Sequence, residues 1–146
     1  MLVPDVNVLV YATITALPQH GPARRFWEQT LNGDEPVGLT HVVIFGFLRI
    51  VTNRRIFSPP LAVEAAVAIV EEWLSLPVVR LLNPSRQELA IALDLLRRQG
   101  TAANLTTDAQ IAAAALSQDA TVVSNDADFK RFAGLRVRSP VSGADQ

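Results

Sequence analysis

Four aspartates in this chain have the type and placement to do metal chemistry. Asp5 follows the apolar run MLVP and precedes the largely apolar run VNVLVYA. A carboxylate buried there costs free energy unless it is paired or bound to something. Asp108 begins an alanine-rich stretch, and Asp126 and Asp128 follow the apolar run TVVSN. If these like charges meet, they repel one another, and a hard divalent cation such as Mg²⁺ or Mn²⁺ removes that repulsion.

Three of these acids also have a structural explanation that needs no cation. Asp108 can offset the dipole of its helix, and Asp126 and Asp128 can cap a short helix that begins near Ala127. Taken singly, each of the three fits this explanation. Asp5 differs, because a capping role there competes with its desolvation cost.

Other catalytic residue sets are absent from the sequence. His20 and His41 have neither HExxH nor HxH spacing, which argues against zinc, and the chain has no cysteine. It also has no GxSxG elbow, no P-loop and no GxGxxG turn. The aspartates are therefore the candidates for catalysis.

Short apolar strands alternate with helical stretches along the chain, and these elements must position the acids. The predicted strands are residues 1–4, 36–40, 77–82, 120–126 and 135–140. The predicted helices are residues 7–14, 21–33, 41–53, 58–76, 84–100, 106–119 and 127–134, with capping boxes at Ser85/Glu88 and Thr107/Gln110. This alternation predicts a three-layer α/β/α sandwich with a mostly parallel central sheet. Ligands of such sheets gather at the carboxyl ends of the strands, where Asp5 and Asp126 fall.

Composition limits the class of protein. The 146 residues fit one domain, which we expect to span 1–140, with 141–146 as a flexible tail. There is no membrane-length apolar run and no signal peptide, so a cytoplasmic location is predicted. A net charge of −1 gives no overall basic field. All but one of the 13 basic residues are Arg, which suits phosphate binding but is equally expected on solvated helix faces.

Taken together, these residues make the chain resemble the PIN-domain family, and within it the VapC-type toxins of bacterial toxin–antitoxin pairs. The resemblance rests on the order of four blocks that span almost the whole chain: PDVNVLVYA, PVGLTHVVIFGFLRIVTNRRIF, ANLTTDAQIAAAAL and TVVSNDADFKRFAGL. It implies an α/β/α fold and a metal-dependent endoribonuclease that uses Mg²⁺, or Mn²⁺, to hydrolyse RNA. It also implies a homodimer that a cognate VapB-type antitoxin holds inactive.

The resemblance assigns roles to the acids. Asp5, Asp108 and Asp126 match the family acids that bind the metal, and Asp128 matches an accompanying acid that assists catalysis. One position departs from the family pattern, because many relatives have a glutamate immediately before FLR, where this chain has Gly46. Either the remaining carboxylates hold the metal, or metal affinity falls, or activity is lost.

Three further residues, Asn7, Asn104 and Ser124, match positions where the family often places polar residues that orient the acids or water. Contacts with RNA phosphates or with the antitoxin are expected at Arg49, Arg54 and Arg55. The leading hypothesis is a working ribonuclease with fewer metal ligands. The alternatives are a weakened or inactive PIN-like module that binds RNA or protein without cutting, and a DNA nuclease of related fold.

Overall fold

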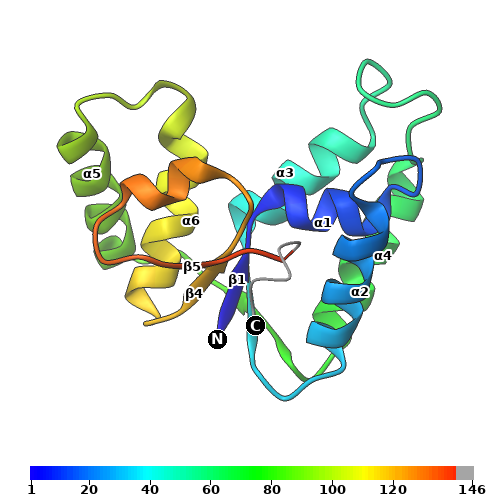
Figure 1. Cartoon of the computed structure of the whole chain (residues 1–146), viewed down its shortest axis with the longest axis horizontal. Helices are drawn as coiled ribbons and strands as arrows, with labels where there is room; N and C mark the ends of the chain where they lie inside the picture. Colours follow the sequence, from blue (N-terminus) through cyan, green and yellow to red (C-terminus); the bar gives the residue numbers. More distant parts are fainter. Residues whose placement is uncertain (141–146) are drawn as a thin grey trace.

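Five short strands form one fully parallel sheet, in the order β3-β2-β1-β4-β5 (Figure 1). The structure is a computed structural model and describes residues 1–140, so the predicted tail at 141–146 lies outside the described residues. The strands are β1 (Leu2–Pro4), β2 (Val37–Thr40), β3 (Val79–Leu82), β4 (Thr121–Val123) and β5 (Arg136–Arg138). The helices are α1 (Val6–Thr13), α2 (His20–Leu31), α3 (His41–Val51), α4 (Val63–Ser75), α5 (Arg86–Gln99) and α6 (Thr106–Ser117), with short 3₁₀ turns η1 (Ala103–Leu105) and η2 (Ala127–Arg131).

The helices cover both faces of the sheet, which confirms the predicted three-layer sandwich (Figure 1). Helices α5 and α6 lie on one side, and α1, α2 and α4 lie on the other. Helix α3 follows β2 directly and packs against α1, α4 and α6. Helix α6 is buried on all sides along one turn, from Ala112 to Ala115. Small side chains let this helix approach its neighbours closely.

Two local predictions are wrong, one on the start of a helix and one on a helix cap. The helix expected from residue 58 begins at Val63, since Pro59 and Pro60 each lack a backbone N–H and disfavour helical conformation in the residue before them. Helix α6 begins at Thr106, so Thr107 is inside the helix and does not cap it. The Ser85 cap is confirmed, because its hydroxyl accepts a hydrogen bond from the Glu88 N–H at 3.1 Å.

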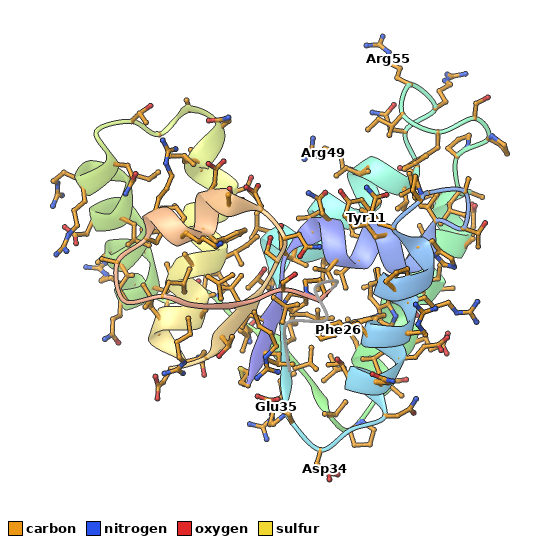
Figure 2. All side chains as sticks on the ribbon, viewed as in Figure 1. Tyr11, Phe26, Asp34, Glu35, Arg49 and Arg55 are labelled. Atoms are coloured by element: carbon orange, nitrogen blue, oxygen red, sulfur yellow. The ribbon has the colours of Figure 1, made fainter. Side chains whose placement is uncertain are left out.

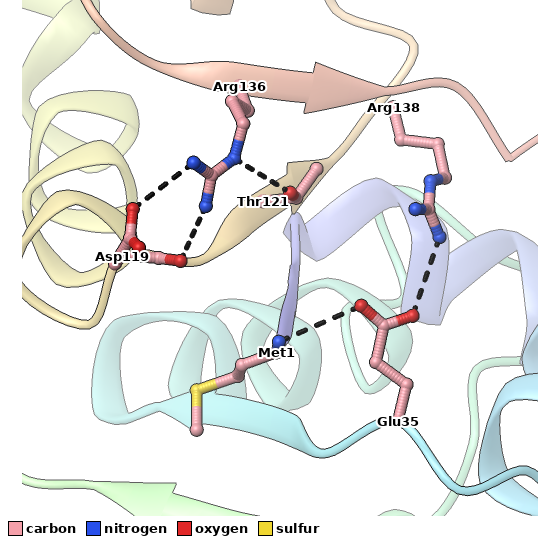
Figure 3. Close-up of polar contacts among 6 residues, drawn as sticks. All are labelled: Met1, Glu35, Asp119, Thr121, Arg136 and Arg138. Carbon is pink, nitrogen blue, oxygen red and sulfur yellow. Dashed lines mark hydrogen bonds and ion pairs between the residues drawn. The ribbon is translucent and has the colours of Figure 1, made fainter.

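Arginines of the edge strand β5 form ion pairs and hydrogen bonds with neighbouring segments (Figure 3). The Arg136 guanidinium donates to the Asp119 carbonyl and lies 3.1 Å from its carboxylate, in the loop before β4. Arg138 and the amino group of Met1 both pair with Glu35, each at 3.7 Å. Each exposed pair contributes well under about 1 kcal/mol, so these contacts orient the strand more than they stabilise it.

Within residues 1–140, no helix is long and apolar enough to cross a membrane.

Gly46 lies at a tight contact between α3 and α1. A Cβ atom added at Gly46 would lie 2.9 Å from Val6 Cγ2 and 3.4 Å from Val6 Cγ1. Val6 is buried, and as a β-branched residue in a helix it has essentially one available rotamer. The space beside Gly46 is therefore filled by the residue that follows Asp5, which gives this glycine a packing reason.

We expect Gly46→Ala to lower the free energy of unfolding by as much as about 2 kcal/mol. Overpacking costs about 1–3 kcal/mol, and the better helix propensity of alanine returns about 1 kcal/mol. Urea denaturation measures the change. Gly21→Ala is the matched control, since its Cβ would meet only Arg25 Nη1 at 3.6 Å. The close contact is refuted if the two alanine variants are equally stable, or if Val6→Ala fails to relieve the Gly46→Ala defect.

Candidate active site

Three buried polar residues mark the carboxyl ends of the three central strands. Asp5 follows β1, Thr40 ends β2, and Ser124 follows β4. They are 4%, 6% and 3% exposed, and no other polar or charged residue in 1–140 is this deeply buried. Polar groups at this depth need hydrogen-bond partners, so this edge of the sheet is built differently from the apolar core around it.

Asp5 is held by hydrogen bonds on both carboxylate oxygens. Its Oδ1 accepts from the Val6 N–H at 2.6 Å, which caps α1, and its Oδ2 accepts from the Ser124 hydroxyl at 2.8 Å. The same hydroxyl accepts from the Asp126 N–H at 2.9 Å. Ser124 therefore connects the first strand to the loop after β4 and fixes two of the predicted acids relative to each other.

Three aspartates come together beside this pair. One carboxylate oxygen each from Asp108, Asp126 and Asp128 lie within 4.8 Å of one another. Asp108 comes from the first turn of α6, and the other two come from the start of η2. Asp126 also caps η2, because its Oδ1 accepts from the Asp128 N–H at 2.9 Å. Its capping and clustering roles therefore coexist.

The predicted metal set and the observed cluster differ by one residue. The resemblance assigns Asp5, Asp108 and Asp126 to the metal, whereas the mutually close oxygens are those of Asp108, Asp126 and Asp128. Asp5 lies next to this cluster, where its charge raises the pKa of Asp108, and both of its oxygens already accept hydrogen bonds.

Burial and mutual repulsion make the ionised acids costly. Desolvation, followed by the charges of Asp5, Asp126 and Asp128, raises the pKa of Asp108 to about 7. Desolvation also raises the pKa of Asp5, against the hydrogen bonds from Ser124 and Val6. Within residues 1–140, the one cationic side chain that pairs with these acids is Arg131, which lies 3.7 Å from Asp128 and is largely exposed. The cluster therefore carries negative charge that described protein groups do not neutralise.

This donor set fits a hard divalent cation. All the donors are carboxylate oxygens, which Mg²⁺ and Mn²⁺ prefer, and several of these oxygens have lone pairs to spare. No other group of three potential metal ligands occurs within residues 1–140. Neither histidine belongs to this group, since His20 contacts the Tyr11 carbonyl and His41 contacts Asn83.

A pocket of about 190 Å³ adjoins the acids. Its walls include the predicted residues Asn7, Ser124 and Asp126, the apolar residues Val8 and Pro140, and two residues that the sequence analysis missed, Tyr11 and Asn125. The signals that could have found these two are the Asn7/Tyr11 spacing of one helical turn and the position of Asn125 directly after a strand end.

The remaining predicted residues lie outside the acid cluster. Asn104 is exposed in η1 and makes no hydrogen bond to an acid within residues 1–140. Arg49 is exposed on α3, and Arg54 and Arg55 are exposed in the loop that follows (Figure 2). None of the three arginines pairs with a carboxylate of the described chain, so their guanidinium groups remain available for an anionic partner.

We expect Ser124→Ala to lower the free energy of unfolding by about 1–3 kcal/mol, because the buried Asp5 carboxylate and the Asp126 N–H both lose their partner. Chemical denaturation gives the value. Ser75→Ala is the control, since its exposed hydroxyl only donates to the Glu72 carbonyl and its removal should change stability by less than about 0.5 kcal/mol. Equal effects of the two variants would contradict the bridging role.

Asp108→Asn should stabilise the metal-free protein at neutral and alkaline pH. The folded pKa of about 7 lies above the unfolded value of 3.8. The native state therefore keeps a proton that the unfolded state releases, and wild-type stability falls as pH rises from about 4 to 7. Asn avoids this loss, so the variant should gain about 1–3 kcal/mol above pH 7 and little near pH 4. Denaturation in EDTA at both pH values tests this, and a gain that does not change with pH would argue against it.

Comparison with known proteins places this geometry in a family. The PIN domain family matches residues 2–135. Ribonuclease VapC33 of Mycobacterium tuberculosis is 48% identical over 141 residues, which cover 97% of this chain and 99% of that protein.

Solved structures share the fold at low identity. The crystal structure of Mycobacterium tuberculosis VapC20, described as a Sarcin-Ricin loop cleaving toxin, has a TM-score of 0.69 at 21% identity and covers 93% of this chain and 99% of its own. VapBC2 from Rickettsia felis, bound to a DNA fragment from its promoter, also has a TM-score of 0.69, at 19% identity, and covers 94% and 97%. The chain therefore belongs to the PIN-domain family, in its VapC ribonuclease branch.

Proposed function

We propose that this chain is a divalent-metal-dependent endoribonuclease that acts as the toxin of a VapBC-type toxin–antitoxin pair. The observation that carries the proposal is the cluster of Asp108, Asp126 and Asp128 beside the buried Asp5. It is supported by the near full-length similarity to a protein named a ribonuclease. Mg²⁺ is the proposed cation, with Mn²⁺ as the substitute of similar ligand preference.

Each acid has a distinct proposed task. Asp108 and Asp126 bind the cation from two sides, because one comes from a helix and the other from a strand-following loop. Asp128 adds a third oxygen to this cluster. Asp5 is held by Ser124, whose hydroxyl also fixes the loop that carries Asp126. When bound, a divalent cation supplies activation of a water and offsets charge on the phosphate.

The protein groups around the site orient the substrate. The unpaired guanidinium groups of Arg49, Arg54 and Arg55 suit RNA phosphates, which Arg can bind through two parallel hydrogen bonds. Binding single-stranded or looped RNA places a phosphate within reach of the acids, since unpaired bases can turn away from the backbone. The same arginines would serve an acidic segment of an antitoxin.

Asp126→Asn should lower the rate of RNA cleavage by about a hundredfold or more. The neutral amide is a poorer ligand for a hard cation than a carboxylate, and the substitution removes one negative charge from the site. The assay is gel-resolved cleavage of single-stranded RNA in Mg²⁺ or Mn²⁺, abolished by EDTA. Asp94→Asn is the control, since Asp94 pairs with Arg97 and Arg98 on the exposed face of α5 and should be dispensable.

The alternatives give different results in this assay. Protein purified away from any antitoxin that binds RNA but never cuts it would identify an inactive binding module. Cleavage of single-stranded DNA at rates equal to RNA would indicate a DNA nuclease. Light scattering of the chain, alone and with an antitoxin encoded beside it, tests the proposed homodimer and the VapB-type partner.

A further inference from the structure

The pocket beside the acids shares Asp126 with the proposed metal site. Ser124 and Asp126 line this pocket, and Asp126 also belongs to the acid cluster. A phosphate held at the cluster would therefore lie next to the pocket. Its volume of about 190 Å³ is below the roughly 300–1,000 Å³ of sites for drug-sized ligands, which suits one planar group.

The pocket walls combine the apolar side chains of Val8 and Pro140 with polar residues that have unused hydrogen-bonding groups. Asn7 and Tyr11 are one turn apart on α1 and line the same pocket. Within residues 1–140, neither the Asn7 side chain nor the Tyr11 hydroxyl makes a hydrogen bond. Asn125 Oδ1 accepts a hydrogen bond from the Ser139 hydroxyl, and the Asn125 amide NH₂ remains as a donor for a ligand.

The charge of the walls argues for a neutral ligand group. No Lys, Arg or His lines the pocket, and its one acid is Asp126, so a second phosphate would not be favoured there. Two amides offer donors and acceptors that match the edge of a nucleobase, and the Tyr11 ring offers a face for stacking. Proteins recognise unpaired RNA bases by this combination of stacking and edge hydrogen bonds.

We propose that the pocket formed by Asn7, Tyr11, Ser124, Asn125 and Asp126 binds one unpaired base next to the scissile phosphate and sets the base preference of cleavage. The inference rests on the proposed ribonuclease function, because it supplies the specificity of the same site. Tyr11 and Asn125 are then specificity-determining residues that contact the substrate and leave the cation to the acids.

The test uses short single-stranded RNAs that differ only in the bases flanking the mapped cleavage site. Asn125→Ala should reduce the spread of cleavage rates among the four bases by about tenfold, while the affinity for Mn²⁺, measured by electron paramagnetic resonance, stays unchanged. Tyr11→Leu should raise KM for every base by about tenfold through lost stacking. Tyr11→Phe keeps the ring and should retain most of the affinity.

Phe45→Leu is the matched aromatic control, because Phe45 is 66% exposed on α3 and outside the pocket. The proposal is overturned if Phe45→Leu changes base preference as much as the pocket variants do, or if Asn125→Ala leaves that preference intact. It is equally overturned if the pocket variants weaken only an antitoxin complex, which would make the pocket a protein-binding site.

A second measurement separates this inference from the ribonuclease proposal. Each nucleoside 5′-monophosphate is titrated with Mg²⁺ into the wild-type chain, and the side-chain amide signals of Asn7 and Asn125 are followed by NMR. Selective shifts with one base support the pocket even if no RNA is cut. Cleavage without any base-dependent shift would support the enzyme and refute the pocket.

Discussion

The buried hydrogen bond between Ser124 and Asp5 is the contact on which the rest of the site depends. It joins the carboxyl ends of two adjacent parallel strands, β1 and β4, inside an otherwise apolar environment. The Ser124 oxygen also accepts from Asp126, and Asp126 in turn accepts from the backbone of Asp128. These three hydrogen bonds fix Asp126 and Asp128 relative to the first strand, although both acids are more than 100 residues away from it in sequence.

The acids are held together at an energetic cost. The tight packing of α6, with its run of buried alanines, places Asp108 near three other carboxylates. Burial, followed by the charges of these acids, raises the pKa of Asp108. Such a cluster is unfavourable for folding and favourable for cation binding, because the cation removes the repulsion. Perturbed titration of this kind is common at functional sites, where stability is given up for chemistry.

The packing around Gly46 offers a structural explanation for the missing glutamate of the family pattern. A missing glutamate by itself suggests lost catalysis. In the structure, the Val6 side chain lies against Gly46 where a Cβ would be, and the carboxylate cluster draws on α6 and η2. The glycine therefore has a packing reason that is independent of catalysis.

The sequence by itself determined the fold class and the strand and helix order, and it singled out four aspartates as candidates, because hydrophobic periodicity and turn residues are local signals. It could not place the start of α4, where prolines override the helical pattern, or the cap of α6, which follows a 3₁₀ turn. Only the tertiary structure decided which three acids meet, that Ser124 holds Asp5, and that Tyr11 and Asn125 face a shared pocket. These are distances between segments far apart in the chain, and such distances depend on how helices pack against the sheet.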